Sequence, residues 1–129
     1  MAPKLTSIVK TVLVIEDKLE IRENTCELLE LQGYKVIFAE NGKTGLAMAK
    51  KNKPDIILCD ILMPEANGYE VFAGLKNDAG TRHIPFVFLT ASAELKEVEA
   101  GLVMGAKGYI RKPFEPDELF ETIERCLAG

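Results

Sequence analysis

The sequence has few cysteines, a single histidine and no long apolar run. Its three cysteines, Cys26, Cys59 and Cys126, are far apart and form no CxxC pair, which is typical of reduced thiols in a cytosolic protein. The one histidine, His83, lies in a polar stretch and is expected to be exposed and inert. No segment has the apolar length of a membrane span or the apolar core of a signal peptide. These absences predict a cytoplasmic protein that does not enter a membrane.

The sequence also lacks an excess of basic residues. Lys and Arg number 16 against 20 Asp and Glu, a formal net charge of −4, whereas a nucleic-acid-binding domain favours a basic stripe. We therefore expect no direct nucleic-acid binding by this domain. The length of 129 residues suits one domain, and we see no internal repeat or linker. Residues 1–10 are expected to be a loose N-terminal leader and residues 11–129 the domain.

Apolar runs alternate with helical patterns along the chain. The expected strands are Thr11–Ile15, Tyr34–Phe38, Ile56–Asp60, Phe86–Leu89 and Gly108–Arg111. After each run, apolar residues recur at helical spacing. After the first run these are Ile21, Leu28 and Leu29, with Thr25 in the same inward stripe, and after the fourth they are Leu95, Val98 and Leu102. Strand and helix thus alternate about five times, which predicts an α/β fold with a doubly wound parallel sheet and helices on both faces.

The third run, from Ile56, is the most informative because it is apolar until it ends in Asp60. Such a run suits a strand buried on both faces, and Pro64 prevents it from continuing. A charge at the end of a buried strand costs roughly several kcal/mol unless another group pairs with it. Asp60 therefore needs partners from elsewhere in the chain.

The other strand ends supply those partners. In a parallel sheet, ligands bind beyond the carboxyl ends of the strands. The residues expected there are Glu16, Asp17, Asp60, Thr90, Ala91 and Lys112. Close carboxylates repel by about 4 kcal/mol per pair at an effective dielectric near 20, and a divalent cation relieves that repulsion. Oxygen ligands of this kind favour Mg²⁺.

A magnesium site facing a lysine suits a phosphoryl group. The hydroxyl of Thr90 and the amide of Ala91 offer donors to phosphoryl oxygens, and Lys112 offers a positive charge. Asp60 is the best candidate for the nucleophile, since it ends the central strand by itself. The product would be an aspartyl phosphate.

The same motifs resemble those of a known family. The acidic pair Glu16-Asp17, Asp60 with Met63-Pro64, Asn67-Gly68, Thr90-Ala91 and Lys112-Pro113-Phe114 are similar in order and spacing to the receiver domain of two-component response regulators. The similarity extends from about Thr11 to about Leu127. It implies a flavodoxin-like (CheY-like) fold with five strands in the order 2-1-3-4-5 and five helices.

The resemblance also implies roles at the site. Asp60 would accept a phosphoryl group from a phosphohistidine on a sensor kinase or a histidine phosphotransfer protein. Asp17 would bind Mg²⁺ directly, Glu16 would act largely through water, and the carbonyl of Leu62 would complete the site. In this family a Glu at the Glu16 position is less frequent than Asp, and it lengthens the reach to the metal by one methylene.

Further implied roles concern the switch. Thr90 and Lys112 would contact the phosphate, the Lys112-Pro113 bond would be cis, and Tyr109 would turn inward after Thr90. The surface of helix four, strand five and helix five would then change, and a homodimer through that surface is plausible. Leu62 and Ser92 occupy positions that influence phosphate lifetime in this family. A receiver domain catalyses only its own phosphoryl transfer and dephosphorylation, so we do not expect a conventional enzyme.

Three alternatives remain open from the sequence. A phosphate-independent interaction module would keep this pattern but bind its partner constitutively. A flavin- or nucleotide-binding protein would want a glycine- or hydroxyl-rich phosphate loop where this chain has Glu16 and Asp17. A phosphate hydrolase of similar fold is disfavoured, because the first strand does not end in Asp-x-Asp.

Overall fold

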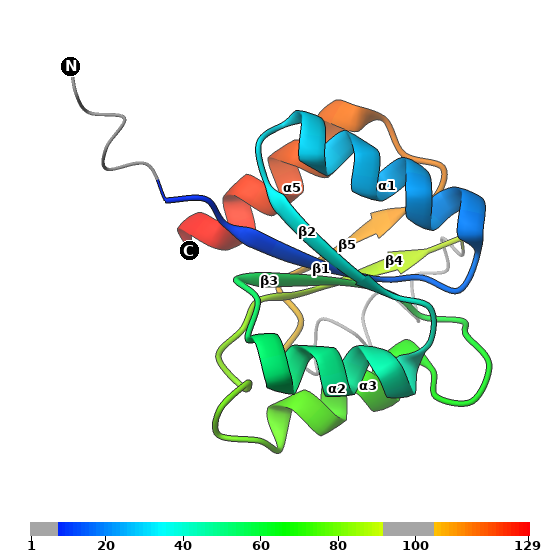
Figure 1. Cartoon of the computed structure of the whole chain (residues 1–129), viewed down its shortest axis with the longest axis vertical. Coiled ribbons are helices and arrows are strands. Elements are labelled where there is room, and N and C mark those ends of the chain that lie inside the picture. Colours follow the sequence, from blue (N-terminus) through cyan, green and yellow to red (C-terminus); the bar gives the residue numbers. More distant parts are fainter. Residues whose placement is uncertain (1–7, 92–104) are drawn as a thin grey trace.

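The strands form one parallel sheet, shown edge-on between its helices in Figure 1. This computed structural model describes residues 8–91 and 105–129. The strands are β1 (Thr11–Ile15), β2 (Lys35–Ala39), β3 (Ile56–Asp60), β4 (Phe86–Thr90) and β5 (Gly108–Arg111). They lie in the order β2-β1-β3-β4-β5, and every neighbouring pair is parallel, which confirms the predicted fold class. The strand order reverses between β1 and β3, where a ligand site is expected.

The described helices cover both faces of the sheet. They are α1 (Leu19–Leu31), α2 (Gly42–Asn52), α3 (Gly68–Lys76) and α5 (Pro116–Ala128). In Figure 1, α1 and α5 lie above the sheet, and α2 and α3 lie below it. The expected helix that carries Leu95, Val98 and Leu102 lies outside the described residues. None of the helices among the described residues has the length and apolarity needed to cross a membrane.

Alternate strand residues build two separate cores, as the period of two along a strand requires. On the α2 and α3 face, Leu13, Ile57 and Phe88 belong to one buried cluster. On the α1 and α5 face, Val14 and Leu58 belong to the other. Every residue of β3 and of β4 is buried, so both strands are rigid supports for the residues at their carboxyl ends.

The predicted bounds of the second strand were wrong by one residue. Tyr34 was expected to begin it, but the N–H of Tyr34 donates to the carbonyl of Leu29 and so completes the end of α1. Gly33, at φ 99°, makes the left-handed turn that brings this about. The strand instead runs on to Ala39, which pairs with Ile15 of β1.

The inner face predicted for the first helix also needs one correction. Thr25 is fully buried in it, as expected, and donates its hydroxyl to the carbonyl of Ile21 at 2.7 Å. Ile21 itself, predicted to face the core, is only half-buried and lines an open cavity. Glu20 and Ile21, in the first turn of α1, line the same cavity as Lys112, so this turn lies at the carboxyl ends of the strands and not over the core.

Candidate functional site

Three carboxylates meet where β1 and β3 end. Glu16, Asp17 and Asp60 each offer an oxygen that lies within 4.8 Å of the others. The register explains this, because Ile15 of β1 pairs with Cys59 of β3 and the acids follow directly. Glu16 is fully buried and Asp60 is 3% exposed. The sequence prediction that these acids converge is thus met by the structure.

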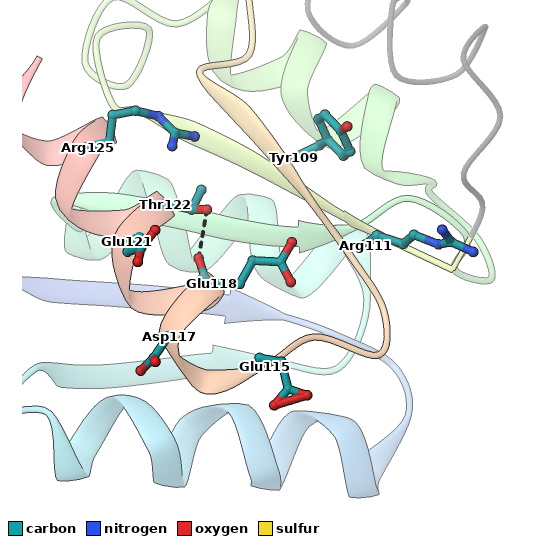
Figure 2. Close-up of a pocket in the computed structure, with 8 residues that line it drawn as sticks. All are labelled: Tyr109, Arg111, Glu115, Asp117, Glu118, Glu121, Thr122 and Arg125. Atoms are coloured by element: carbon teal, nitrogen blue, oxygen red, sulfur yellow. Dashed lines mark hydrogen bonds between the residues drawn. The ribbon is translucent and has the colours of Figure 1, made fainter.

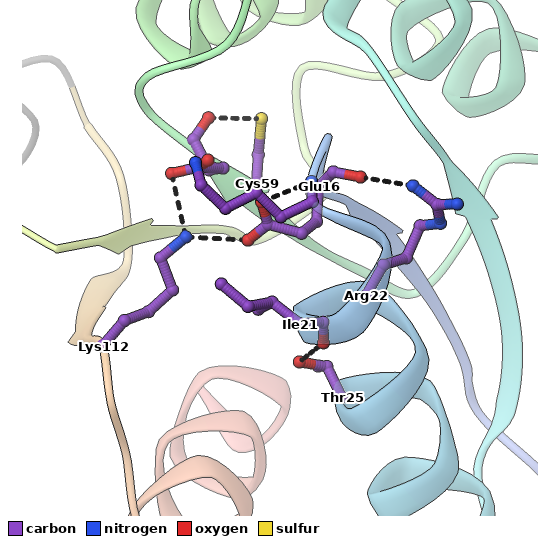
Figure 3. Close-up of polar contacts among 8 residues, drawn as sticks. Glu16, Ile21, Arg22, Thr25, Cys59 and Lys112 are labelled. Carbon is purple, nitrogen blue, oxygen red and sulfur yellow. Dashed lines mark hydrogen bonds and ion pairs between the residues drawn. The ribbon is translucent and has the colours of Figure 1, made fainter.

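Glu16 is held at all four of its polar positions. Its N–H donates to the carbonyl of Ala39 at 3.1 Å, and its carbonyl accepts from Nη1 of Arg22 at 2.9 Å. Its carboxylate accepts from Nζ of Lys112 at 2.8 Å and from the backbone N–H of Lys18 at 3.2 Å (Figure 3). The side chain and the peptide of Glu16 are therefore both fixed.

Lys112 is the cation of the cluster, and its side chain is 9% exposed. Its Nζ lies 2.8 Å from Oε1 of Glu16 and 3.4 Å from Oδ1 of Asp60. The sequence suggested Asp60 as a partner for this lysine, and the structure gives Glu16 the shorter contact. The longer side chain of Glu, compared with Asp, provides that reach. Lys112 thus forms ion pairs with two of the three carboxylates, those of Glu16 and Asp60, and not with that of Asp17.

The electrostatics of the cluster favour a proton on Asp60 when no metal is bound. The pKa of Asp60 is raised from 3.8 to about 7, mainly by burial and then by the neighbouring charge of Glu16, while Lys112 acts to lower it. The site is therefore short of positive charge. A divalent cation would supply that charge and release the proton.

Asp17 shows where such a cation fits. Its Oδ1 is buried and has no hydrogen-bond partner among the described residues. A buried carboxylate oxygen in that state costs roughly 1–3 kcal/mol or more, so it requires an explanation. Together with one oxygen each from Glu16 and Asp60, it makes the hard-oxygen donor set that Mg²⁺ prefers. The residues present fit the ion.

The remaining predicted site residues surround this cluster. Thr90 is buried at the end of β4, and its carbonyl accepts from the backbone N–H of Lys112 at 2.7 Å. Ala91 follows it and is exposed. Leu62, in the loop after β3, is 66% exposed, so its apolar side chain points away from the core. The Lys112–Pro113 peptide bond is cis.

Tyr109, the predicted switch residue, lies apart from the carboxylates. Tyr109 stands on β5 with 43% of its side chain exposed, in an outward position. Ser92 lies outside the described residues. His83 is exposed, as predicted.

Sequence reasoning missed contacts that involve the backbone. Nothing in the residue types marks Arg22 as a donor to the Glu16 carbonyl. Glu65, in the loop after β3, has φ 71°, an uncommon conformation for a residue other than glycine. Asn67 begins α3 with a reciprocal pair of hydrogen bonds to Glu70, a capping role that was not predicted from the sequence. That Asn-x-x-Glu spacing is a capping-box signal that the sequence did offer.

Gly68 brings α3 against the strand that carries Asp60. A Cβ at Gly68 would lie 2.5 Å from the carbonyl oxygen of Asp60 and 2.9 Å from the Cα of Ile61, both backbone atoms that cannot move aside. We expect Gly68→Ala to lower the free energy of unfolding by about 3 kcal/mol, because overpacking against backbone has no easy relief. Urea denaturation followed by circular dichroism measures it.

A matched control is available on the same helix. A Cβ at Gly74 would meet only the side chain of Leu46, at 3.1 Å, which can shift. Gly74→Ala is expected to stay within about 1 kcal/mol of the wild type, since the gain in helix propensity offsets the crowding. Equal losses from the two substitutions would contradict the role given to Gly68.

Two cavities flank the strand ends. One of about 420 Å³ opens beside Lys112 and is lined by Ile21 and Asn24 of α1, by Ala91, and by Phe114. The other, of about 790 Å³, lies over β5 and α5 and is lined by Tyr109 and Arg111 of β5 and by Glu118 and Arg125 of α5 (Figure 2). The carboxylate cluster itself lies between β1 and β3, and Lys18 and Lys112, which both line the first cavity, donate hydrogen bonds to its Glu16 carboxylate.

Comparison with known proteins agrees with this geometry. The response regulator receiver domain family matches residues 12–124. The phosphate regulon transcriptional regulatory protein PhoB of Pseudomonas aeruginosa is 40% identical over 118 residues, which are 92% of this chain and 52% of PhoB. Protein PilH of the same organism is 36% identical, over 92% of this chain and 98% of PilH. This chain thus spans about half the length of PhoB and nearly all of PilH.

A solved structure is similar over almost the whole chain. It is the receiver domain of the sensor histidine kinase PA1611 from Pseudomonas aeruginosa PAO1, with a TM-score of 0.87 and 26% identity, covering 95% of this chain and all of that one. The family match, the strand order and the carboxylate cluster lead to one conclusion. The chain belongs to the family of response regulator receiver domains, the phosphoacceptor signalling domains of two-component systems.

Proposed function

We propose that Asp60 is the phosphoacceptor and that it takes its phosphoryl group from a phosphohistidine of a sensor kinase or a histidine phosphotransfer protein. One observation carries this proposal: a cluster of three carboxylates at the sheet's switch point, two of them buried, has Lys112 as the one lysine paired with it among the described residues. Such a cluster is costly to keep for stability alone. A site that binds Mg²⁺ and a phosphoryl group makes use of it.

Glu16, Asp17, Asp60 and the carbonyl of Leu62 would hold the Mg²⁺. The bound ion would neutralise charge on the carboxylates and on the phosphoryl oxygens. The structure of the PA1611 receiver domain, which has a magnesium ion coordinated in its active site cleft, supports this assignment. So does the buried Oδ1 of Asp17, which has no hydrogen-bond partner among the described residues.

The residues of the chain would then perform the transfer. An oxygen of Asp60 attacks phosphorus, and the bond between phosphorus and the histidine nitrogen breaks with its electron pair staying on that nitrogen. The histidine leaves as the neutral imidazole, because its other ring nitrogen already carries a proton. Lys112 provides a positive charge for the phosphoryl oxygens, 3.4 Å from the attacking carboxylate. The Thr90 hydroxyl and the Ala91 amide, at the end of β4, would donate to the same oxygens. The reaction forms one acyl phosphate on the domain.

The partner would approach over the cavity beside Lys112. That cavity combines apolar side chains, such as Ile21 and Phe114, with the polar Asn24 and the charged Lys18. A surface of this kind suits a helical protein that carries an exposed phosphohistidine. We propose that docking occurs in the cytoplasm, in keeping with three free cysteines, and without direct contact to membrane or nucleic acid.

Output would pass through Thr90 and Tyr109. Drawing the Thr90 hydroxyl toward the phosphate would leave space for Tyr109, now outward and 43% exposed, to turn inward. The surface around Tyr109, Arg111 and Arg125 would change with it (Figure 2). The mixed charges of this surface also suit a homodimer through β5 and α5. Helix four, the third part of the predicted surface, lies outside the described residues.

The test is direct labelling of the chain. Acetyl phosphate with MgCl₂ is expected to add one phosphoryl group by intact mass, and peptide mapping is expected to place a hydroxylamine-sensitive modification on Asp60. EDTA in place of MgCl₂ is expected to prevent it. Modification that is independent of Mg²⁺, or that maps away from Asp60, would refute the assignment.

A further inference from the structure

Arg22 connects α1 to the strand end that carries the acidic pair. Its Nη1 donates to the carbonyl of Glu16 at 2.9 Å, as Figure 3 shows, and its guanidinium lies 5.5 Å from the ring centroid of Phe38. Phe38 stands on the edge strand β2 and is 56% exposed. An exposed ring on an edge strand gains little from burial. The guanidinium above it accounts for an aromatic residue at that place.

The backbone of Glu16 is held by β2 at its N–H and by α1 at its carbonyl. The N–H of Glu16 donates to Ala39, which follows Phe38 on β2, and the carbonyl of Glu16 accepts from Arg22. Asp17 is the next residue. Its Oδ1 has no hydrogen-bond partner of its own in the described part of the chain. The direction of the Asp17 carboxylate therefore depends on the plane of the Glu16–Asp17 peptide, which Arg22 fixes.

We propose that Arg22 is a positioning residue for the divalent-cation site and that Phe38 is the platform on which its guanidinium rests. Arg22 would act through the backbone of Glu16 and would touch neither the ion nor the phosphoryl group. The inference rests on the proposed binding of Mg²⁺ by Asp17.

Electrostatics and positioning predict opposite effects of removing Arg22. The guanidinium is a positive charge close to the acidic pair, so its loss by itself strengthens attraction for Mg²⁺. Loss of the bond to Glu16 instead frees the peptide that directs Asp17, which weakens Mg²⁺ binding. The sign of the change in affinity therefore separates a positioning role from a general charge effect.

Lys18 provides the matched control. Lys18 lies in the loop that carries Glu16 and Asp17, and its side chain is exposed. Its hydrogen bond to Glu16 comes from the backbone N–H, which a substitution keeps. Lys18→Ala removes one positive charge near the acidic pair and leaves the peptide in place. It reports the charge effect alone.

Calorimetric titration of the full 129-residue chain with MgCl₂ tests the proposal. Arg22→Ala is expected to weaken Mg²⁺ binding about 10-fold, the lower end of what a lost support of a metal ligand costs. Phe38→Leu is expected to weaken it about 3-fold through loss of the cation–π contact. The double variant should be no weaker than Arg22→Ala, because Phe38 acts only through Arg22. Arg22→Lys, which keeps the charge and one donor, should fall between Arg22→Ala and the wild type.

Thermal unfolding in EDTA accompanies each titration, so that affinities are compared only between folded proteins. If Arg22→Ala does not fold, Phe38→Leu and Arg22→Lys carry the test. Unchanged or tighter Mg²⁺ binding in Arg22→Ala, or the same weakening in Lys18→Ala, would overturn the positioning role of Arg22. The proposed function of the site would stand in either case. A wild-type chain that binds no Mg²⁺ would overturn the proposed function, and this inference with it.

Discussion

Asp60→Asn is expected to abolish phosphorylation by acetyl phosphate, a loss of at least about 1,000-fold in labelling rate, because an amide oxygen is a poor nucleophile and cannot form an acyl phosphate. Intact mass measurement in the presence of MgCl₂ is sufficient to show it. The neighbouring acids Glu16 and Asp17 stay in place, so they serve as an internal control. Continued labelling of the variant at either acid would show that the site has no unique acceptor.

The same substitution is expected to stabilise the metal-free fold at neutral and higher pH. The pKa of Asp60 is raised to about 7 in the folded chain, mainly by burial and then by the charge of Glu16. A carboxyl with a raised pKa contributes stability that is fully present below its ordinary pKa of 3.8 and lost as the pH rises through about 7.

Asparagine at position 60 does not ionise, so the variant avoids that loss of stability at high pH, but it also lacks a carboxylate partner for Lys112. We therefore expect a net gain of about 2 kcal/mol for Asp60→Asn at pH 8 in EDTA, falling toward zero at pH 5, where Asp60 in the wild type is protonated. Urea denaturation at a series of pH values measures it. A gain that does not depend on pH would contradict the proposed charge repulsion.

Sequence reasoning succeeded where a residue's place follows from the sheet alone. β3 and β4 are buried along their whole length, and unbroken apolar runs indicate such strands. Once the strands are parallel, their carboxyl ends lie along one edge of the sheet. Glu16 and Asp60 come close because β1 and β3 are neighbours there, and that strand order was implied by the family resemblance and not by the apolar pattern.

It failed where a contact depends on how one element is turned against another. Arg22 reaches Glu16 only because α1 returns over the end of β1 at one particular angle, and the bond ends on a backbone carbonyl that has no sequence signature. The preference of Lys112 for Glu16 over Asp60, 2.8 Å against 3.4 Å, depends on the side-chain lengths in a finished cluster. Neither distance follows from spacing along the chain.

Lys112→Met is expected to lower the free energy of unfolding by about 3 kcal/mol at pH 8 in EDTA. Methionine keeps most of the apolar stem and removes the charge, so Glu16 and Asp60 remain buried without their cation. Because Lys112 lowers the pKa of Asp60, its loss moves that pKa further upward. The deficit should therefore shrink as the pH falls from the higher pKa of the variant toward about 7, and stay level below about 7, where Asp60 is protonated in both proteins.

The exposed pair Lys50–Asp78 is the control for a lysine that merely contacts an acid. Its atoms are 3.9 Å apart with side chains 45% and 38% exposed, so Lys50→Met is expected to change stability by less than about 0.5 kcal/mol. Mg²⁺ is expected to restore part of the stability of Lys112→Met and none in Lys50→Met, because only the first lacks charge at the carboxylate cluster. Denaturation midpoints with and without MgCl₂ distinguish these outcomes. If Mg²⁺ gives Lys112→Met no more stability than it gives the wild type, the lysine and the ion do not neutralise the same carboxylates.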